Sequence, residues 1–192
     1  CIALLPTAGG KSICFQIPAL IKKGICIVIS PLIALMQDQV KGLNAKGIKA
    51  TALTNLDQLG DLERILDNCI YGDYKFLYLS PERLQNALVQ ERIKSMDVHL
   101  IAVDEAHCIS QWGHDFRPAY ISIKDIRGLC PKATILALTA TATKKVIFDI
   151  DEQLALKQSK LFKGSFFRKN LSYKTMIFED SLFGRKAAYD SG

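Results

Sequence analysis

A Gly-Gly-Lys-Ser turn close to the start of the chain has the residue types that bind a phosphate. It lies in the string Leu5-Pro6-Thr7-Ala8-Gly9-Gly10-Lys11-Ser12, between an apolar strand pattern and an amphipathic helix pattern. In that setting backbone N–H groups and a helix N-terminus face an anion. We expect Lys11 to reach the β and γ phosphates of a nucleotide and the Ser12 hydroxyl to ligate Mg²⁺. The backbone that lines the phosphates is expected at Thr7, Ala8, Gly9 and Gly10.

Two adjacent carboxylates, Asp104 and Glu105, follow the buried-strand pattern Leu100–Val103. Ligands of parallel α/β sheets bind at the carboxyl ends of strands, where the phosphate-binding turn also lies. Asp104 is expected to hold Mg²⁺ and Glu105 to orient and deprotonate the attacking water. Taken singly, the pair is more typical of a helix start, where Asp caps and Glu suits the dipole. Because the Lys11 turn lies about ninety residues upstream, we favour nucleotide hydrolysis.

A polar loop that follows the carboxylates carries the only tryptophan of the chain, Trp112. Its neighbours include Gln111, His114, Phe116 and Arg117. Aromatic faces stack on unpaired bases without sequence preference, and arginine adds phosphate or stacking contacts. The alternative is a buried tryptophan that anchors the loop against the core. The polar flanking residues favour an exposed, base-stacking side chain.

Short apolar runs alternate with longer segments of helical period. Strands are expected at Ile2–Leu5, Ile25–Ile29, Ala50–Leu53, Phe76–Leu79, Leu100–Val103, Thr134–Leu138 and Leu161–Phe166. Helices are expected near Lys11–Lys22, Leu32–Lys46, Leu59–Ile70, Glu82–Lys94, Ile121–Leu129 and Thr143–Leu154. Fully apolar strands separated by helix-length crossovers predict an α/β fold, with a mostly parallel central sheet and helices on both faces. The strand order is not readable from the sequence.

The composition is that of a globular domain of 192 residues, with 49% apolar and 23% charged residues. The longest apolar run, Ile25–Met36, is broken by Ser30 and Pro31 and is shorter than the ~20 residues of a membrane span. Six cysteines without a CxxC pair predict a reduced, intracellular protein. Eight basic and three acidic residues in 157–192 give +5 of the net charge of +6. This asymmetry indicates either contact with a polyanion or a solvated segment.

At these residues the chain resembles superfamily-two helicases and, more narrowly, the RecQ family of ATP-dependent DNA helicases. Asp104-Glu105-Ala106-His107 runs directly into Cys108-Ile109-Ser110-Gln111-Trp112-Gly113-His114-Asp115-Phe116-Arg117-Pro118, which is similar to the family's motif II and aromatic-rich loop. Similar to further family motifs are Ser30–Gln39, Ser80–Leu84 and Leu138–Thr143. The resemblance covers nearly the whole chain. It implies a RecA-like P-loop domain over 1–173, with 174–192 starting a linker to a second RecA-like domain.

The resemblance also implies a function: the parent enzyme binds ATP, Mg²⁺ and single-stranded DNA or DNA junctions, and unwinds duplexes in DNA repair and recombination. The loop would sense DNA and signal to the ATP site through His107, Gln111, His114, Thr139 and Thr141. DNA contacts are implied for Trp112, Phe116, Arg117, Ser30 and Arg83. From the residues alone, His107 is often a plain loop residue, and Thr139 and Thr141 cap the next helix.

Three departures from the family pattern stand out. Ala8 replaces a glycine, and Lys169 replaces a proline in Phe166–Leu171. The family's adenine-reading motif and the second domain's arginine finger are absent from the sequence, so the chain alone is expected to be nearly inactive. We expect a cytoplasmic or nucleoid protein, or a nuclear one in a eukaryote. Two alternatives stay open: a DEAH-type RNA helicase or remodelling ATPase, and a nucleic-acid-binding module without activity.

Overall fold

The computed structural model describes residues 1–7, 9–54, 59–156 and 159–165. Ala8 and the expected linker over 174–192 lie outside these residues, as does Lys169. All six cysteines are described, and all are free thiols. In the described part of the chain, no helix combines the length and apolar character needed to cross a membrane.

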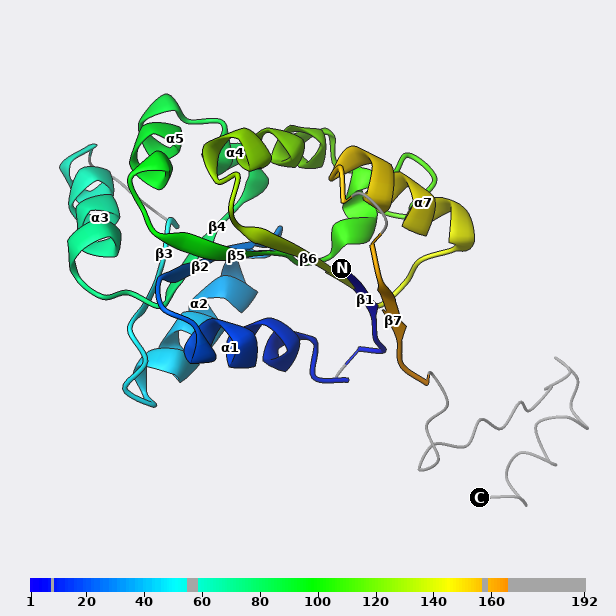
Figure 1. The fold of residues 1–192 in the computed structure, drawn as a ribbon, viewed down its shortest axis with the longest axis horizontal. Coiled ribbons are helices and arrows are strands. Elements are labelled where there is room, and N and C mark those ends of the chain that lie inside the picture. Colours follow the sequence, from blue (N-terminus) through cyan, green and yellow to red (C-terminus); the bar gives the residue numbers. More distant parts are fainter. Residues whose placement is uncertain (8, 55–58, 157–158, 166–192) are drawn as a thin grey trace, which may run out of the picture.

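Seven parallel strands form one sheet in the order β3-β4-β2-β5-β6-β1-β7 (Figure 1). The strands are β1 (Ile2–Leu4), β2 (Ile25–Ile29), β3 (Ala50–Ala52), β4 (Phe76–Leu79), β5 (Val98–Val103), β6 (Thr134–Thr139) and β7 (Leu161–Lys163). Chain order and sheet order differ because each parallel neighbour is reached by a crossover. The carboxyl ends of β1, β2, β5 and β6 consequently meet at one edge of the sheet, where the predicted site residues lie.

Helices cover both faces of the sheet, as the sequence predicted (Figure 1). On one face lie α1 (Lys11–Ile21) and α2 (Ile33–Asn44). The other face carries α3 (Leu59–Tyr71), α4 (Pro81–Leu84), α5 (Ala87–Lys94), α6 (Ile126–Leu129) and α7 (Lys144–Gln153), with the 3-10 helices η1 (Ala106–Ile109) and η2 (Pro118–Asp125). Strand β2 supplies both cores by alternation: Ile25, Ile27 and Ile29 face the larger cluster, and Cys26 and Val28 face the smaller one.

Two expected helices were wrong in form. The segment expected as one helix over Glu82–Lys94 is divided into α4 and α5, because Asn86 interrupts it and caps α5 by accepting from Leu88 N and Val89 N. The expected helix over Ile121–Leu129 begins earlier as η2 and becomes α-helical only in its last turn, α6. The remaining predicted elements are present, and their ends differ by no more than two residues, except that β7 ends at Lys163 and not at Phe166, which lies outside the described residues.

Candidate active site

The Gly-Gly-Lys-Ser turn connects β1 to α1 in the way the phosphate-binding prediction requires. Gly10, with φ of 79°, is the residue immediately before α1, and Gly9 N donates to Pro6 O over 2.9 Å. A Cβ on Gly9 would lie 2.7 Å from that same carbonyl oxygen. Both positions therefore need glycine, one for a left-handed conformation and one for close backbone approach. The turn in front of α1 is open toward solvent at Thr7, Gly9 and Gly10, which are exposed.

Asp104 and Glu105 lie at the carboxyl end of β5, in the middle of the sheet. Asp104 N donates to Ile29 O of β2 over 2.8 Å, and the Tyr120 hydroxyl donates to Asp104 O over 3.0 Å. The side-chain Oδ1 of Asp104 accepts from Glu105 N, and Glu105 itself adopts a left-handed φ of 46°. No side chain caps η1. The helix-capping alternative for this pair is therefore wrong.

Lys11 and Glu105 form an ion pair across a cavity of about 400 Å³, with 2.8 Å between Lys11 Nζ and Glu105 Oε1. The cavity is lined by Thr7, Gly10, Lys11, Ser12, Leu35, Gln39, Asp104 and Glu105. The structure thus brings together every described residue predicted to bind nucleotide except Gly9, which is in the same turn. The two groups predicted to act on phosphate and on water neutralise each other in this state.

The two carboxyls of the cavity differ in their acidity. The pKa of Glu105 is lowered to about 2, first by its hydrogen bond with His107 and then by Lys11, against the opposing effect of burial. The pKa of Asp104 is raised, first by burial and then by the neighbouring negative charge of Glu105. A divalent cation beside Asp104 would offset both causes, because it favours the charged form. The acidity of the pair therefore suits a cation at Asp104 and a permanently ionised Glu105.

His107 connects Glu105 to two other parts of the chain. Its Nδ1 lies 2.9 Å from Thr139 Oγ1 at the end of β6 and 3.4 Å from Glu105 Oε2. Its ring stacks on that of His114, with centroids 4.5 Å apart. His107 and Thr139, which the resemblance implied in coupling, are thus in contact, whereas Thr141 hydrogen-bonds Thr139 Oγ1 through its backbone.

The capping alternative for these threonines is wrong, because the hydroxyl that caps α7 belongs to Thr143, which accepts from Val146 N.

A second cavity of about 270 Å³ adjoins the first. It is lined by Thr7, Pro31, Leu32, Glu105, His107, His114, Asp115, Arg117, Ala140 and Thr141. Thr7 and Glu105 line both cavities. Glu105 therefore lies between the phosphate-binding turn and the tryptophan loop.

The loop residues predicted to contact DNA differ in exposure. Trp112 is 64% exposed, so the exposed interpretation is confirmed over the core anchor. Gln111 and His114 are also exposed, whereas Phe116 and Arg117 are half-buried. A DNA contact by any of them stays a prediction.

The two DNA contacts predicted outside the loop lie at other strand ends. Arg83 is half-buried in α4, where its N–H donates to Ser80 Oγ. Ser30 is 2% exposed, and its hydroxyl lies beside the Asp104 carboxyl, where it opposes the rise in the pKa of that group. The predicted DNA contact of Ser30 stays a prediction, and this burial is evidence against it.

Several residues that hold the site were not assigned a role from the sequence. Gln39 of α2 donates to Ser12 Oγ over 3.1 Å and accepts from the Tyr78 hydroxyl over 2.9 Å, so it orients the predicted Mg²⁺ ligand. Tyr120 holds the backbone of Asp104. Gln39 lies in a motif string that resembled the family, which was the available signal. Tyr78 and Tyr120 are aromatic residues in apolar surroundings, and nothing in the sequence separates them from ordinary core residues.

His107, Cys108 and Asp115 place three possible metal-ligating atoms within 4.8 Å of one another. Burial, and next the charge of Asp115, raise the pKa of the Cys108 thiol to about 12. The Cys108 thiol donates to Asp115 Oδ2 over 3.8 Å and lies 3.8 Å from His107 Nε2. We therefore interpret this group as hydrogen-bonded packing at the base of the loop.

Comparison with known proteins agrees with this geometry. The DEAD/DEAH box helicase family matches residues 1–150. The chain is 47% identical over 178 residues to the ATP-dependent DNA helicase RecQ of Bacillus subtilis, covering 92% of this chain and 30% of that protein. The chain spans about a third of the length of the curated relatives it matches. The resemblance to RecQ helicases is thereby confirmed.

Solved helicase structures share the fold. The Pyrococcus furiosus Hef helicase domain has a TM-score of 0.63 and 22% identity, covering 93% of this chain and 38% of that one. The helicase MrfA, solved with DNA and AMPPNP, has a TM-score of 0.64 and 19% identity, covering 84% of this chain and 24% of that one. The predicted RecA-like α/β fold is confirmed. The family match over residues 1–150 shows that the chain belongs to the DEAD/DEAH box helicase family.

Proposed function

We propose that this chain is the first motor domain of a RecQ-type ATP-dependent DNA helicase, which couples ATP hydrolysis to translocation on single-stranded DNA and to unwinding of duplexes and junctions. The observation that supports this most directly is the position of Glu105. It contacts Lys11 on the side of the phosphate-binding turn and His107 on the side of the tryptophan loop. A carboxylate shared in this way suits an ATPase whose turnover responds to DNA.

MgATP fits the residues of the larger cavity. The Lys11 ammonium and the open turn in front of α1 offer positive potential to the phosphates. Ser12 Oγ and the Asp104 carboxylate line the same cavity, and Asp104 is 6% exposed. No ion-pair partner of Asp104 is found among the described residues, so this buried carboxylate suits a bound cation. When bound, Mg²⁺ would neutralise phosphate charge.

Nucleotide binding and hydrolysis use the Lys11–Glu105 pair in sequence. Lys11 exchanges the carboxylate for the phosphates of ATP, which releases Glu105 from its ammonium partner. Glu105 then keeps His107 as a hydrogen-bond partner and orients the attacking water. The backbone of Asp104 and Glu105 stays fixed by Tyr120 and Ile29. Hydrolysis therefore depends on the direction in which His107 holds Glu105.

DNA would act on this arrangement through the loop. His114 stacks on His107, and His107 is also held by Thr139. A shift of the loop when bases stack on Trp112 changes the contact between His114 and His107, and with it the position of Glu105. In this proposal Gln111, His114 and Thr141 assist coupling, and Phe116, Arg117 and Arg83 contribute DNA contacts.

A second RecA-like domain of the same parent chain is proposed to supply an arginine finger. Arginine fingers contribute about 10³–10⁵ in rate in comparable phosphoryl-transfer enzymes, so this chain alone should hydrolyse ATP very slowly. We further propose that the parent acts inside the cell, on cytoplasmic, nucleoid or nuclear DNA. Six free thiols suit a reducing compartment.

The decisive experiment compares polynucleotides on the parent enzyme and on this chain. Steady-state phosphate release is measured without nucleic acid, with single-stranded DNA and with RNA of the same sequence, using Glu105→Gln as the inactive control. DNA should stimulate the parent well beyond RNA, and the chain alone should stay slow with either. Equal stimulation by RNA would favour the DEAH-type RNA helicase alternative. Turnover of several per second by this chain would contradict the need for a second domain.

A further inference from the structure

The tryptophan loop is attached to helix α7 by two contacts that differ in strength. At the base of the loop, Ser110 is 1% exposed and its Oγ donates to Asp149 Oδ2 over 2.5 Å, while Trp112 N donates to Ser110 Oγ over 3.1 Å. At the tip, Lys145 Nζ lies 3.1 Å from the centroid of the Trp112 ring. Lys145 and Asp149 are four residues apart in α7, so they lie on the same face of the helix.

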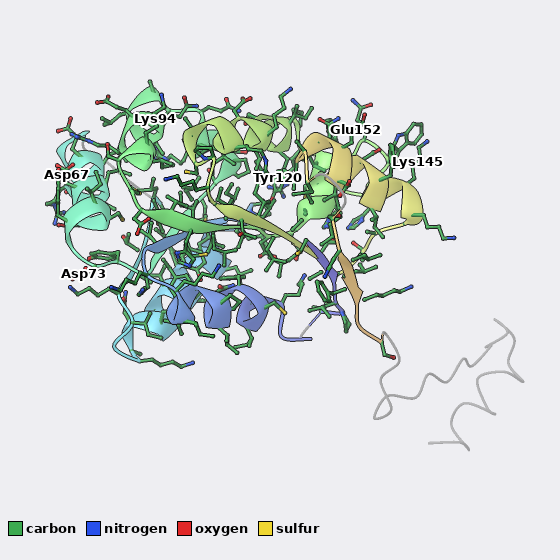
Figure 2. All side chains as sticks on the ribbon, viewed as in Figure 1. Asp67, Asp73, Lys94, Tyr120, Lys145 and Glu152 are labelled. Atoms are coloured by element: carbon green, nitrogen blue, oxygen red, sulfur yellow. The ribbon has the colours of Figure 1, made fainter. Side chains whose placement is uncertain are left out.

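The Lys145 ammonium lies over one face of the Trp112 ring. Trp112 is 64% exposed and Lys145 is exposed as well. Figure 2 shows Lys145 on the outer side of α7, facing away from the sheet, whereas Tyr120 lies close to the sheet. A cation over an aromatic ring uses the same π face that a nucleobase needs for stacking. A base and Lys145 therefore compete for that face of Trp112.

The two contacts also respond differently to a ligand. The bond between Ser110 and Asp149 is shielded by burial and charge-assisted, which makes it the stronger one. The cation–π contact lies in solvent and is weak. When a base displaces Lys145, the loop is thus expected to stay anchored at Ser110 while its tip moves. His114, which stacks on His107, lies between this tip and the base of the loop at Arg117.

We propose that Lys145 and Asp149 are positioning residues for the tryptophan loop: Asp149 fixes its base, and Lys145 holds Trp112 on α7 until single-stranded DNA takes the ring face. This inference rests on the proposed function, because it assumes that Trp112 stacks on DNA bases. It assigns α7 a role in DNA response that none of its residues had from the sequence. Because a stacked base would displace Lys145 from the ring, removal of Lys145 should strengthen DNA binding, although it removes a positive charge.

The sole tryptophan of the chain makes the contact directly measurable, since all tryptophan fluorescence comes from Trp112. The test variant is Lys145→Ala, and the matched control is Lys144→Ala, an exposed neighbour on α7 with the same charge. Lys145→Arg keeps a cation over the ring. Without DNA, acrylamide should quench Trp112 more strongly in Lys145→Ala than in wild type, Lys144→Ala or Lys145→Arg. Acrylamide is uncharged, so the change in net charge does not affect this measurement.

Titration with a short oligothymidylate then reads the competition. Both alanine variants lose one positive charge, and this weakens phosphate attraction equally. Lys145→Ala additionally frees the ring face, so its dissociation constant should be about 2- to 5-fold lower than that of Lys144→Ala. Lys145→Arg should behave as wild type. Asp149→Asn, which weakens the anchor at the loop base, should increase acrylamide quenching without reproducing the tighter DNA binding.

Three results would overturn the inference or its foundation, and they are distinguishable. Equal DNA affinity of the two alanine variants means that Lys145 is only a phosphate contact. Equal acrylamide quenching in wild type and Lys145→Ala means that the contact does not shield the ring. If wild-type chain that melts cooperatively shows no change in Trp112 emission with oligothymidylate, the proposed DNA function itself fails, whatever acrylamide reports.

Discussion

Replacing Glu105 with glutamine should separate nucleotide binding from hydrolysis, because Glu105 restrains Lys11 before it acts on water. Glu105→Gln keeps the shape of the side chain and removes its charge. In wild type, Lys11 must leave Glu105 Oε1, 2.8 Å away, before it can reach a phosphate. In the variant this ion pair no longer competes with ATP. We therefore expect nucleotide affinity to rise, while turnover of the parent enzyme is lost.

The size of the gain follows from the burial of the ion pair. The side chains of Lys11 and Glu105 are 15% and 24% exposed, so solvent still screens their attraction. Ion pairs that remain in contact with solvent contribute ~0.2–1 kcal/mol. Since this pair is more buried than a surface pair, the upper part of that range applies, and the dissociation constant for MgATP should fall by about 2- to 5-fold.

The assay is an equilibrium titration of the chain with a fluorescent ATP analogue and Mg²⁺. Lys11→Ala should weaken binding, since it removes phosphate charge compensation. In the Lys11→Ala background, Glu105→Gln should give a smaller gain than in wild type, because no ammonium is left to release. This double-mutant cycle isolates the competition from general repulsion between Glu105 and the phosphates.

Weaker nucleotide binding by Glu105→Gln would refute this reasoning, as it would make Glu105 a ligand of the bound nucleotide. Wild-type turnover in the same variant of the parent enzyme would show that Glu105 is not the general base. A gain in affinity that is equally large with and without Lys11 would leave repulsion alone as its cause and would contradict the exchange of partners.

Three further perturbations test the surroundings of the site. Because the pKa of Asp104 is raised in the folded protein, the stability that Asp104 contributes is present at low pH and is lost as the pH rises through that pKa. Asp104→Asn should therefore raise the melting temperature at pH 7, while nucleotide binding by the variant should require more Mg²⁺. A lower melting temperature of the variant would contradict this. Tyr120→Phe removes the hydroxyl that donates to Asp104 O, so the free energy of unfolding measured with denaturant should fall by ~1–3 kcal/mol. An unchanged free energy of unfolding would mean that water replaces this hydroxyl as the donor. Trp112→Ala should lower the free energy of unfolding by well under the ~3–5 kcal/mol of a core tryptophan, because Trp112 is 64% exposed. The variant should still lower the DNA-stimulated ATPase of the parent enzyme at saturating DNA. A large loss of stability would restore the core-anchor interpretation.

Much of the fold was predictable because the strands are buried on both faces. Runs such as Ile25–Ile29 and Phe76–Leu79 are apolar throughout, and their bounds were predicted without error. The division between α4 and α5 was missed because Asn86 is a weak local signal within a segment of helical period. The 3-10 form of η2 was missed because the pattern of apolar residues does not distinguish it from an α-helix.

The site was predictable where chemistry depends on residue type, and unpredictable where it depends on distance. Lys11, Ser12, Asp104 and Glu105 were predicted from their types to form one phosphate and metal site, and the structure places them around one cavity. Their ion pairing was not, since it depends on how β1 and β5 are placed with β6 between them. The contact of Lys145 with Trp112 was missed for the same reason: an exposed lysine on an amphipathic helix has no distinctive pattern.

In the proposed function, the position of Glu105 allows one residue to respond both to nucleotide and to DNA. Before ATP binds, its two oxygens have separate partners, Lys11 at Oε1 and His107 at Oε2. Once the phosphates take Lys11, His107 is the contact that still orients the carboxylate. His107 is in turn held by Thr139 from β6 and stacked by His114 from the loop. In the proposed mechanism, loss of Lys11 from the pair would leave Glu105 held from the loop side alone, so DNA would influence the attacking water only after ATP has bound.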